Sequence, residues 1–252
     1  MKKIKAFLRS KYSKQYKLLQ KIFYILYAFV ETRVLGTSIY EYIWRTRHIF
    51  KSTQLEKQWS EGVRQEFRNL IREGILSCPL PIESILDVGC GTGQYLFSLH
   101  SEFPLIKMYG IDINKQSIAF GRKKLREESI KNIMLINGSL DELKKIPAEA
   151  YDMVFTIMVL LYTGNDKIIN IAKEMLRISK KRILLIEPHV SSLGESTANN
   201  LGFFHQGQWV RNYSYIFESL GVPKKNIICS QISLPSWSSS DLKSDYLIQI
   251  DL

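Results

Sequence analysis

The sequence has few cysteines, and their positions exclude two common kinds of site. Cys78, Cys90 and Cys229 are scattered over 252 residues and form no CxxC pair. An odd, scattered set lacks the regular spacing of a disulfide framework and the paired spacing of a structural zinc site. We therefore expect a cytoplasmic protein in a reducing compartment, with a function that needs no metal ion.

The N-terminal part lacks both acidic residues and a long apolar run. The first 21 residues contain eight bases and no acid, and the apolar run Ile22–Val30 has nine residues. Spanning a bilayer takes about 20 apolar residues. These N-terminal residues also lack the small-residue cleavage site of a signal peptide.

The net positive charge is confined to residues 1–72. Residues 1–72 carry 16 Lys and Arg against 5 Asp and Glu, which accounts for the whole net charge of +11. Apolar residues recur at near-helical spacing between the lysines of residues 4–30. This pattern predicts an amphipathic helix with two alternative roles. Residues 1–30 contact an anionic membrane surface, so that the protein is peripheral to the membrane, or they pack over the core as a lid or a dimer element.

The remainder of the chain alternates strand-like and helix-like segments. Short apolar strands are predicted at residues 84–89, 107–113, 132–138, 151–159 and 181–187, and helices at residues 93–103, 114–129 and 165–179, the second of them capped by Asn114. Strands that alternate with helices indicate a doubly wound α/β fold with a mostly parallel sheet. We expect two domains, a basic helical extension over residues 1–75 and a catalytic domain over residues 76–252.

The alternation of strands and helices ends near the C-terminus. Residues 209–221 are predicted to form a helix with Gly221 at its C-terminus, and two strands follow at residues 225–233 and 244–252. No helical pattern separates those two strands. A loop connection of this kind predicts an antiparallel pair.

A glycine-rich turn joins the first predicted strand to the first predicted helix. Its spacing is Gly89-x-Gly91-x-Gly93 in the stretch "LDVGCGTGQY". The dinucleotide fingerprint GxGxxG has two residues before its last glycine, and the P-loop has Lys-Ser/Thr after it. This turn has neither feature, so it matches no pyrophosphate-binding or triphosphate-binding loop.

Acidic and polar residues end the neighbouring strands. Asp87 lies two residues before Gly89, and Asp112 ends the next strand, 19 residues after Gly93. An acid at the end of that strand can accept hydrogen bonds from ribose hydroxyls. Residues 137–140, Asn-Gly-Ser-Leu, follow the third strand. Ligands of open α/β sheets bind at the carboxyl ends of the strands, where all these residues are expected.

On these motifs the sequence resembles the class I S-adenosylmethionine-dependent methyltransferases. "LDVGCGTG", "YGIDIN" and "YDMVFTIMVLLY" are similar to the motifs of the first, second and fourth strands of that family. The resemblance runs from about residue 76 to the C-terminus. It implies a seven-stranded Rossmann-like sheet with an antiparallel last strand, and S-adenosyl-L-methionine as cofactor.

The resemblance also implies roles for individual residues. Asp87 would face the cofactor's ammonium or sulfonium group, and Asp112 would bind the ribose. Ser139 stands where the family commonly has Asp at the adenine edge. The residues expected to bind the cofactor are Asp87, Gly89, Cys90, Gly91, Gly93, Asp112, Ile113, Ser139, Leu140 and Thr156.

The acceptor side is expected after the fourth and fifth strands. Tyr162, Glu187 and His189 are the candidate catalytic residues there, with His189 as the first choice for a general base. His205, Trp209, Arg211 and Tyr213 lie in a region that could cover the acceptor. Trp209 and Tyr213 are four residues apart, as on one face of a helix.

The interpretation is a methyltransferase that O-methylates a small molecule or glycan by direct displacement. The alternatives are a non-catalytic cofactor-binding module, a nicotinamide-dependent oxidoreductase, and a nucleic-acid or lipid/quinone methyltransferase. The glycine spacing and Asp87 argue against the oxidoreductase. Residues 73–252 have no net charge and lack the basic stripe expected of a duplex binder, so nucleic acid is not the expected partner.

Overall fold

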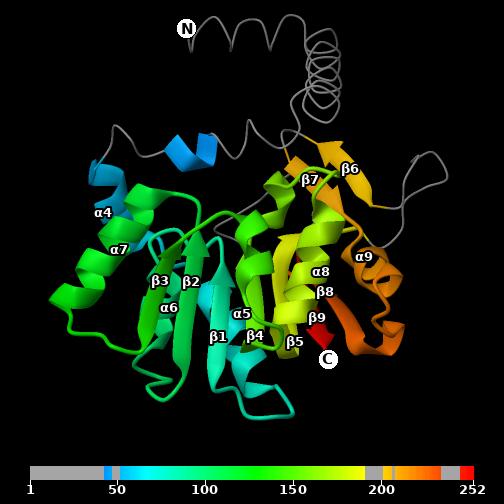
Figure 1. The fold of residues 1–252 in the computed structure, drawn as a ribbon, viewed down its shortest axis with the longest axis horizontal. Coiled ribbons are helices and arrows are strands. Elements are labelled where there is room, and N and C mark those ends of the chain that lie inside the picture. Colours follow the sequence, from blue (N-terminus) through cyan, green and yellow to red (C-terminus); the bar gives the residue numbers. More distant parts are fainter. Residues whose placement is uncertain (1–42, 47–51, 191–200, 206–207, 234–244) are drawn as a thin grey trace, which may run out of the picture.

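The computed structural model describes residues 43–46, 52–190, 201–205, 208–233 and 245–252 (Figure 1). A seven-stranded sheet in the order β3-β2-β1-β4-β5-β9-β8 forms its centre. The strands are β1 (Ser84–Val88), β2 (Lys107–Asp112), β3 (Ile133–Asn137), β4 (Tyr151–Ile157), β5 (Ser179–Pro188), β8 (Ile227–Gln231) and β9 (Asp245–Asp251). β1 to β5 are parallel, whereas β9 runs antiparallel to both β5 and β8. The predicted doubly wound sheet and its antiparallel final pair are confirmed.

Helices cover both faces of the sheet. One face carries α4 (Ser52–Glu61), α5 (Gln65–Leu76), α6 (Gln94–Leu99) and α7 (Lys115–Glu127), and the other carries α8 (Ile168–Ile178), α9 (Tyr213–Ser219) and the short 3₁₀ helix η2 (Leu140–Lys145) (Figure 1). Two further 3₁₀ turns are η3 (Leu160–Tyr162) and η4 (Lys224–Asn226). Because side chains alternate along a strand, Ile183 and Leu185 of β5 face one layer, and Leu184 and Ile186 face the other. Both faces of β5 are therefore apolar.

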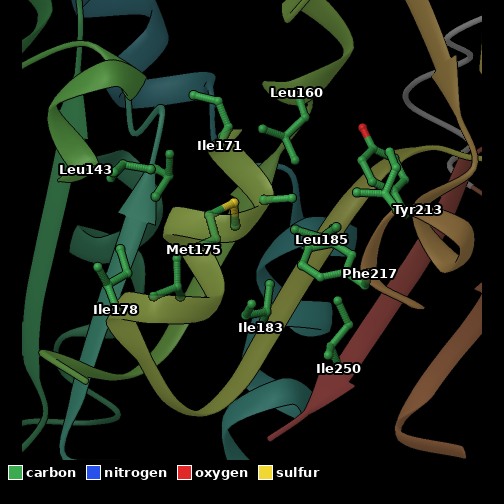
Figure 2. Close-up of a cluster of buried hydrophobic side chains, with 14 of the residues drawn as sticks. Leu143, Leu160, Ile171, Met175, Ile178, Ile183, Leu185, Tyr213, Phe217 and Ile250 are labelled. Carbon is green, nitrogen blue, oxygen red and sulfur yellow. The ribbon is translucent and has the colours of Figure 1, made fainter. Parts of the chain in front are cut away.

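The packing of α8 shows how a helix is fixed on this sheet. Ile171, Met175 and Ile178 lie on one face of α8, where spacings of three and four residues align them. They are buried in one cluster with Ile183 of β5 and Phe217 of α9 (Figure 2). This packing fixes the chain between the end of β4 and the start of β5.

The predicted helix over residues 209–221 is wrong at its start. Gln208–Arg211 forms strand β7, which pairs with β6 (Gly202–His205), and α9 begins at Tyr213. The Asn212 side chain accepts a hydrogen bond from the backbone N–H of Tyr215, so it caps the helix there. Trp209 and Tyr213 consequently do not share a helix face. The end of the helix is as predicted, with Gly221 in a left-handed conformation at φ 95°.

The other predicted elements correspond closely to those observed. Asn114 caps α7 by accepting a hydrogen bond from the N–H of Ser117 at 2.9 Å. Helix α5, at the end of the expected extension, packs Phe67 and Ile71 into the core beneath the sheet. The domain division at residues 75 and 76 stays a prediction.

The predicted amphipathic helix of residues 4–30 lies outside the described residues. Among those that are described, no helix combines the length and the apolarity that crossing a membrane requires. The membrane, lid and dimer readings of residues 1–30 therefore stay predictions.

Candidate functional site

A cavity of about 260 Å³ opens at the carboxyl ends of β1, β2 and β4. Its lining combines the glycine turn, the ends of β2 and β3, and the segment after β4. The lining residues are Trp44, Asp87, Gly89, Cys90, Gly91, Gln94, Tyr95, Ile111, Asp112, Ile113, Asn114, Ser117, Gly138, Ser139, Leu140, Ile157, Met158, Val159, Tyr162, Thr163, Lys167 and Ile171. Most of the residues predicted to bind a cofactor thus surround one space.

The glycine turn is held against the neighbouring strands. The N–H groups of Gly89 and Cys90 both donate to the carbonyl of Ile111, at 2.8 and 3.1 Å. Gly89 has φ 82°, and a Cβ atom at this position would lie 2.3 Å from a methyl carbon of Val159. Only glycine accommodates both the left-handed conformation and the close contact. The turn therefore brings bare backbone to the cavity.

Asp112 organises the β2 side of the cavity. Its carboxylate accepts hydrogen bonds from the N–H of Gly91 at 2.8 Å and from that of Asn114 at 2.7 Å. Burial raises the pKa of Asp112, and these two hydrogen bonds oppose the rise. A carboxylate has about four acceptor positions, so Asp112 retains capacity for hydroxyl donors from a ligand.

Asp87 has a different environment at the end of β1. Its side chain is 2% exposed, and no described residue donates a hydrogen bond to its carboxylate. Burial, and then the charge of Asp112, raise the pKa of Asp87 well above its usual value. An orphaned buried carboxyl beside a second one is costly unless a positive ligand group compensates it. The pair therefore forms a site suited to a cation.

Most of the other predicted cofactor residues also lie at this cavity. Cys90, Ile113, Ser139 and Leu140 are part of its lining. Gly93 and Thr156 are not part of the lining that the structure describes. Gly93, at φ 81°, precedes α6, and the Thr156 hydroxyl donates to Glu187 at 2.9 Å.

Of the three candidate catalytic residues, Tyr162 lines the cavity, whereas Glu187 and His189 are not part of its described lining. The Glu187 carboxylate accepts hydrogen bonds from Thr156 and from three backbone N–H groups of the segment after β4. These donors are Val159 at 2.8 Å, Leu160 at 3.0 Å and Leu161 at 3.3 Å. Burial raises the pKa of Glu187 to about 7 against the effect of these hydrogen bonds. In this geometry Glu187 holds the turn that carries Tyr162.

His189 is enclosed between aromatic rings. Its Nδ1 atom accepts a hydrogen bond from the N–H of Tyr213 at 3.2 Å, and its ring packs against Tyr213 and Tyr246. Burial lowers the pKa of His189 to about 4, which keeps the imidazole neutral at physiological pH. The catalytic roles of Tyr162, Glu187 and His189 stay predictions.

Of the residues expected to cover the acceptor, His205, Trp209 and Arg211 lie on the β6–β7 hairpin at the carboxyl edge of the sheet, whereas Tyr213 begins α9 (Figure 1). The buried Arg211 guanidinium donates hydrogen bonds to the carbonyl of Thr163 and to the side chain of Asn165, and it lies 4.1 Å from the ring centroid of Trp209. The hairpin is thereby tied to the segment after β4.

A family model described as a methyltransferase domain matches residues 82–221, more than half of the chain. The chain belongs to this methyltransferase-domain family. The matched region contains the glycine turn, both cavity carboxylates and the segment after β4.

Two curated relatives of this methyltransferase domain are similar over shorter stretches. Demethylmenaquinone methyltransferase of Lactococcus lactis subsp. lactis (strain IL1403) is 36% identical over 109 residues, 41% of this chain and 41% of the relative. The tRNA (guanine-N(7)-)-methyltransferase of Oceanobacillus iheyensis is 26% identical over 111 residues, 43% of this chain and 45% of the relative. The chain thus spans less than half the length of either relative.

Solved structures of methyltransferases share the fold. Magnesium protoporphyrin IX methyltransferase from Synechocystis PCC 6803, solved with bound SAM, matches with a TM-score of 0.56 at 15% identity, over 84% of this chain and 96% of that one. A SAM-dependent methyltransferase from Aquifex aeolicus matches with a TM-score of 0.52 at 16% identity, over 80% and 97% of the two chains. At these identities the likeness shows the fold of the domain.

The methyltransferase domain also has cavity residues that the sequence patterns did not single out. Trp44 lies 40 residues before the first strand, and Asn114 was recognised as a helix cap at the end of the motif "YGIDIN" without a role in binding. Lys167 lies at the cavity and pairs with Asp141 at 2.9 Å. No spacing rule links these positions to the glycine turn, so only the fold reveals them.

Proposed function

We propose that this domain binds S-adenosyl-L-methionine and O-methylates a small molecule or glycan, with a small molecule favoured. The observation that carries the proposal is the Asp87 carboxylate, buried without a described hydrogen-bond donor beside Asp112. The proposed cofactor has an ammonium group and a sulfonium cation, which would supply the missing positive charge. A nicotinamide dinucleotide would bring an anionic pyrophosphate to the same acids, which disfavours that alternative.

The remaining cavity residues fit the other parts of this cofactor. Asp112 would accept hydrogen bonds from the ribose hydroxyls, and the glycine turn would let the backbone approach closely. Ile113 and Leu140 would pack against the adenine, and the Ser139 hydroxyl would accept a bond from its amine. The names of the relatives, which include quinone, tRNA and porphyrin methyltransferases, support methyl transfer and leave the acceptor open.

When bound, this cofactor would supply an electrophilic methyl group: the bond from the acceptor oxygen to the methyl carbon would form as the sulfonium–carbon bond breaks, S-adenosylhomocysteine would leave, and the hydroxyl proton would pass to solvent water. The chain would contribute mainly positioning, because alignment provides much of the rate of such a reaction. Tyr162 lies on the cavity wall and is the candidate to hold the acceptor hydroxyl. Since the Glu187 carboxylate is occupied by internal donors and His189 is enclosed, neither serves as the base in this proposal.

Calorimetry with S-adenosylmethionine, S-adenosylhomocysteine and NADH tests the proposal. We expect both sulfur compounds to bind, NADH not to bind, and EDTA to leave the affinities unchanged. Because the cation favours ionised Asp87, the affinity for S-adenosylmethionine should rise as the pH rises through the raised pKa of Asp87. Asp87→Asn should bind about 10- to 100-fold more weakly and lose that pH dependence. Tighter binding of NADH would refute the proposal.

A nucleic-acid acceptor is the second candidate, and the excess of 16 bases over 5 acids in residues 1–72 favours it. Contacts of these Lys and Arg side chains with phosphates would make binding strongly salt-dependent. Methyl transfer from radiolabelled S-adenosylmethionine to total RNA, compared with transfer to a small-molecule extract, distinguishes a nucleic-acid acceptor from a small-molecule acceptor.

Contact of residues 1–30 with an anionic membrane is a further proposal. Vesicle sedimentation of the protein with and without those residues tests it.

A further inference from the structure

An aromatic pair joins the N-terminal part of the chain to the segment after β4. The rings of Trp44 and Tyr162 lie 4.9 Å apart between centroids with an interplanar angle of 55°, and both residues line the cavity. We propose that Trp44 and Tyr162 form the wall of the acceptor subsite, that this wall selects an acceptor with a flat apolar ring, and that Asn114 positions Trp44. The inference rests on the proposed methyltransferase function and names the substrate class of the same site.

Tyr162 lies on the segment after β4, and buried side chains of other strands hold this segment in place. The Glu187 carboxylate binds the N–H groups of Val159, Leu160 and Leu161 at the start of this segment. The Arg211 guanidinium binds Thr163 and Asn165 just beyond Tyr162. Buried side chains of β5 and β7 thus hold both ends of the turn. Such support gives the Tyr162 ring a fixed place, as selection of an acceptor by shape requires.

A buried amide binds the backbone of Trp44. The Asn114 side chain, 4% exposed, donates through Nδ2 to the carbonyl of Trp44 at 2.8 Å. Its Oδ1 atom caps α7, and its backbone N–H donates to Asp112. Asn114 therefore connects the carboxylate proposed to bind ribose with the aromatic residue proposed to bind the acceptor.

The surroundings of the pair define the chemistry of an acceptor. Ile157, Met158 and Val159 line the cavity next to Tyr162, and Ile171 of α8 adds another apolar side chain. Lys167 is the cation of this part of the described lining, and Asp141 pairs with it at 2.9 Å. A flat ring would gain offset or edge contacts with the two aromatic rings. The hydroxyls of a sugar would instead lose their hydrogen bonds to water against the apolar side chains around the pair.

The probes for the test are 1-naphthol, a flat aromatic alcohol, and methyl β-glucoside, a non-planar one. Protein saturated with S-adenosylhomocysteine is titrated with each probe under saturation-transfer NMR. We expect 1-naphthol to bind and the glucoside not to bind. Trp44→Ala should weaken 1-naphthol about 10-fold, and Trp44→Phe less than about 3-fold. Trp59→Ala is the matched control, because Trp59 packs on Phe97 away from the described lining and should leave naphthol binding unchanged.

Asn114→Ser tests the positioning role. Serine keeps an N-cap oxygen for α7 but lacks the amide that reaches Trp44. We expect it to weaken 1-naphthol severalfold, and the double variant with Trp44→Ala to bind as weakly as Trp44→Ala alone. Additive losses would show that Asn114 acts only on the fold and would overturn its role.

Four further outcomes would contradict the inference or the proposed function. Unchanged naphthol binding by Trp44→Ala, or preferred binding of the glucoside, overturns the acceptor subsite. An equal loss of S-adenosylhomocysteine affinity in Trp44→Ala assigns the ring to the cofactor and also overturns it. Failure of the wild-type protein to bind S-adenosylhomocysteine by calorimetry instead refutes the proposed function, which is thereby distinguished from failure of this inference.

Discussion

Two buried carboxyl groups at the same edge of the sheet differ in their hydrogen-bond partners. Asp87, at the end of β1, has no hydrogen-bond donor among the described residues, and its pKa is raised well above the usual value. Glu187, at the end of β5, accepts four hydrogen bonds from Thr156 and the segment after β4. The donors of Glu187 are part of the fold, whereas those of Asp87 have to come from elsewhere.

This difference separates a binding carboxylate from an architectural one. Burying a charge without partners costs on the order of several kcal/mol, so a buried carboxyl without hydrogen-bond donors stays protonated until a positive ligand group compensates the carboxylate. The environment of Asp87 thus indicates a cationic ligand. The environment of Glu187 indicates a role in shaping the turn that bears Tyr162. From the sequence, Asp87 was expected to face a cofactor cation, and Glu187 was a candidate catalytic residue.

The largest effect is expected on the cofactor side, from Gly91→Val. Gly91 has φ 58°, and its N–H donates to Asp112. A β-branched residue is strained in this conformation and would fill space at the cavity, so cofactor affinity should fall more than about 100-fold. Calorimetry with S-adenosylhomocysteine measures the change. Gly221→Ala, also left-handed at φ 95° but with nothing within 4 Å of the added Cβ, is the matched control and should bind normally. Normal binding by Gly91→Val would remove the turn from the site.

A smaller loss on the same side is expected from Asp112→Ala. Removing one or two hydrogen bonds to a partly buried ribose should weaken the cofactor about 5- to 150-fold. Calorimetry provides the affinity, and circular dichroism confirms that the variant is folded. Glu127→Ala, at a partly exposed acid near the end of α7, controls for the general loss of negative charge. A folded Asp112→Ala protein with wild-type affinity would contradict the ribose assignment.

For the second buried carboxyl group, Glu187→Gln should change how the free energy of unfolding depends on pH. The folded pKa of about 7 exceeds the usual 4.5, so folding favours the protonated form. The resulting stabilisation is complete below about pH 4.5 and is lost as the pH rises to about 7. The free energy of unfolding should fall by about 1–3 kcal/mol over this range. Denaturant unfolding across this range should show that slope in the wild-type protein relative to Glu187→Gln. Parallel curves for the two proteins would argue against a strongly perturbed Glu187.

His189→Gln should show the opposite dependence of stability on pH. The folded pKa of about 4 is below the usual 6.5, so folding favours neutral imidazole. Its stabilising effect is present above about pH 6.5 and disappears as the pH falls to about 4. The same unfolding series, with wild type compared to His189→Gln, measures it. Cofactor affinity should change less than about 3-fold, because His189 is outside the described cavity lining. A large loss of cofactor affinity would place His189 in the site after all.

Much of the fold follows from local pattern. The alternation of apolar strands and amphipathic helices predicted the parallel sheet, and Asn114 was recognised as a cap because capping depends on residues three apart. The glycine turn was also readable, because left-handed conformations at Gly89, Gly91 and Gly93 require glycine in the sequence itself. Asp87 and Asp112 follow from their positions at strand ends.

Only the tertiary structure shows the features that depend on contacts between distant segments of the chain. The start of α9 moved to Tyr213 because pairing of residues 208–211 with β6 overrides their helical spacing. Glu187 became a support for the segment after β4 because that segment folds back over the end of β5. Trp44 reached Asn114 and Tyr162 across 70 and 118 residues. Sequence spacing records the period of a helix or strand, but which distant residues meet is determined by packing, and packing is what brings Trp44 to the cavity.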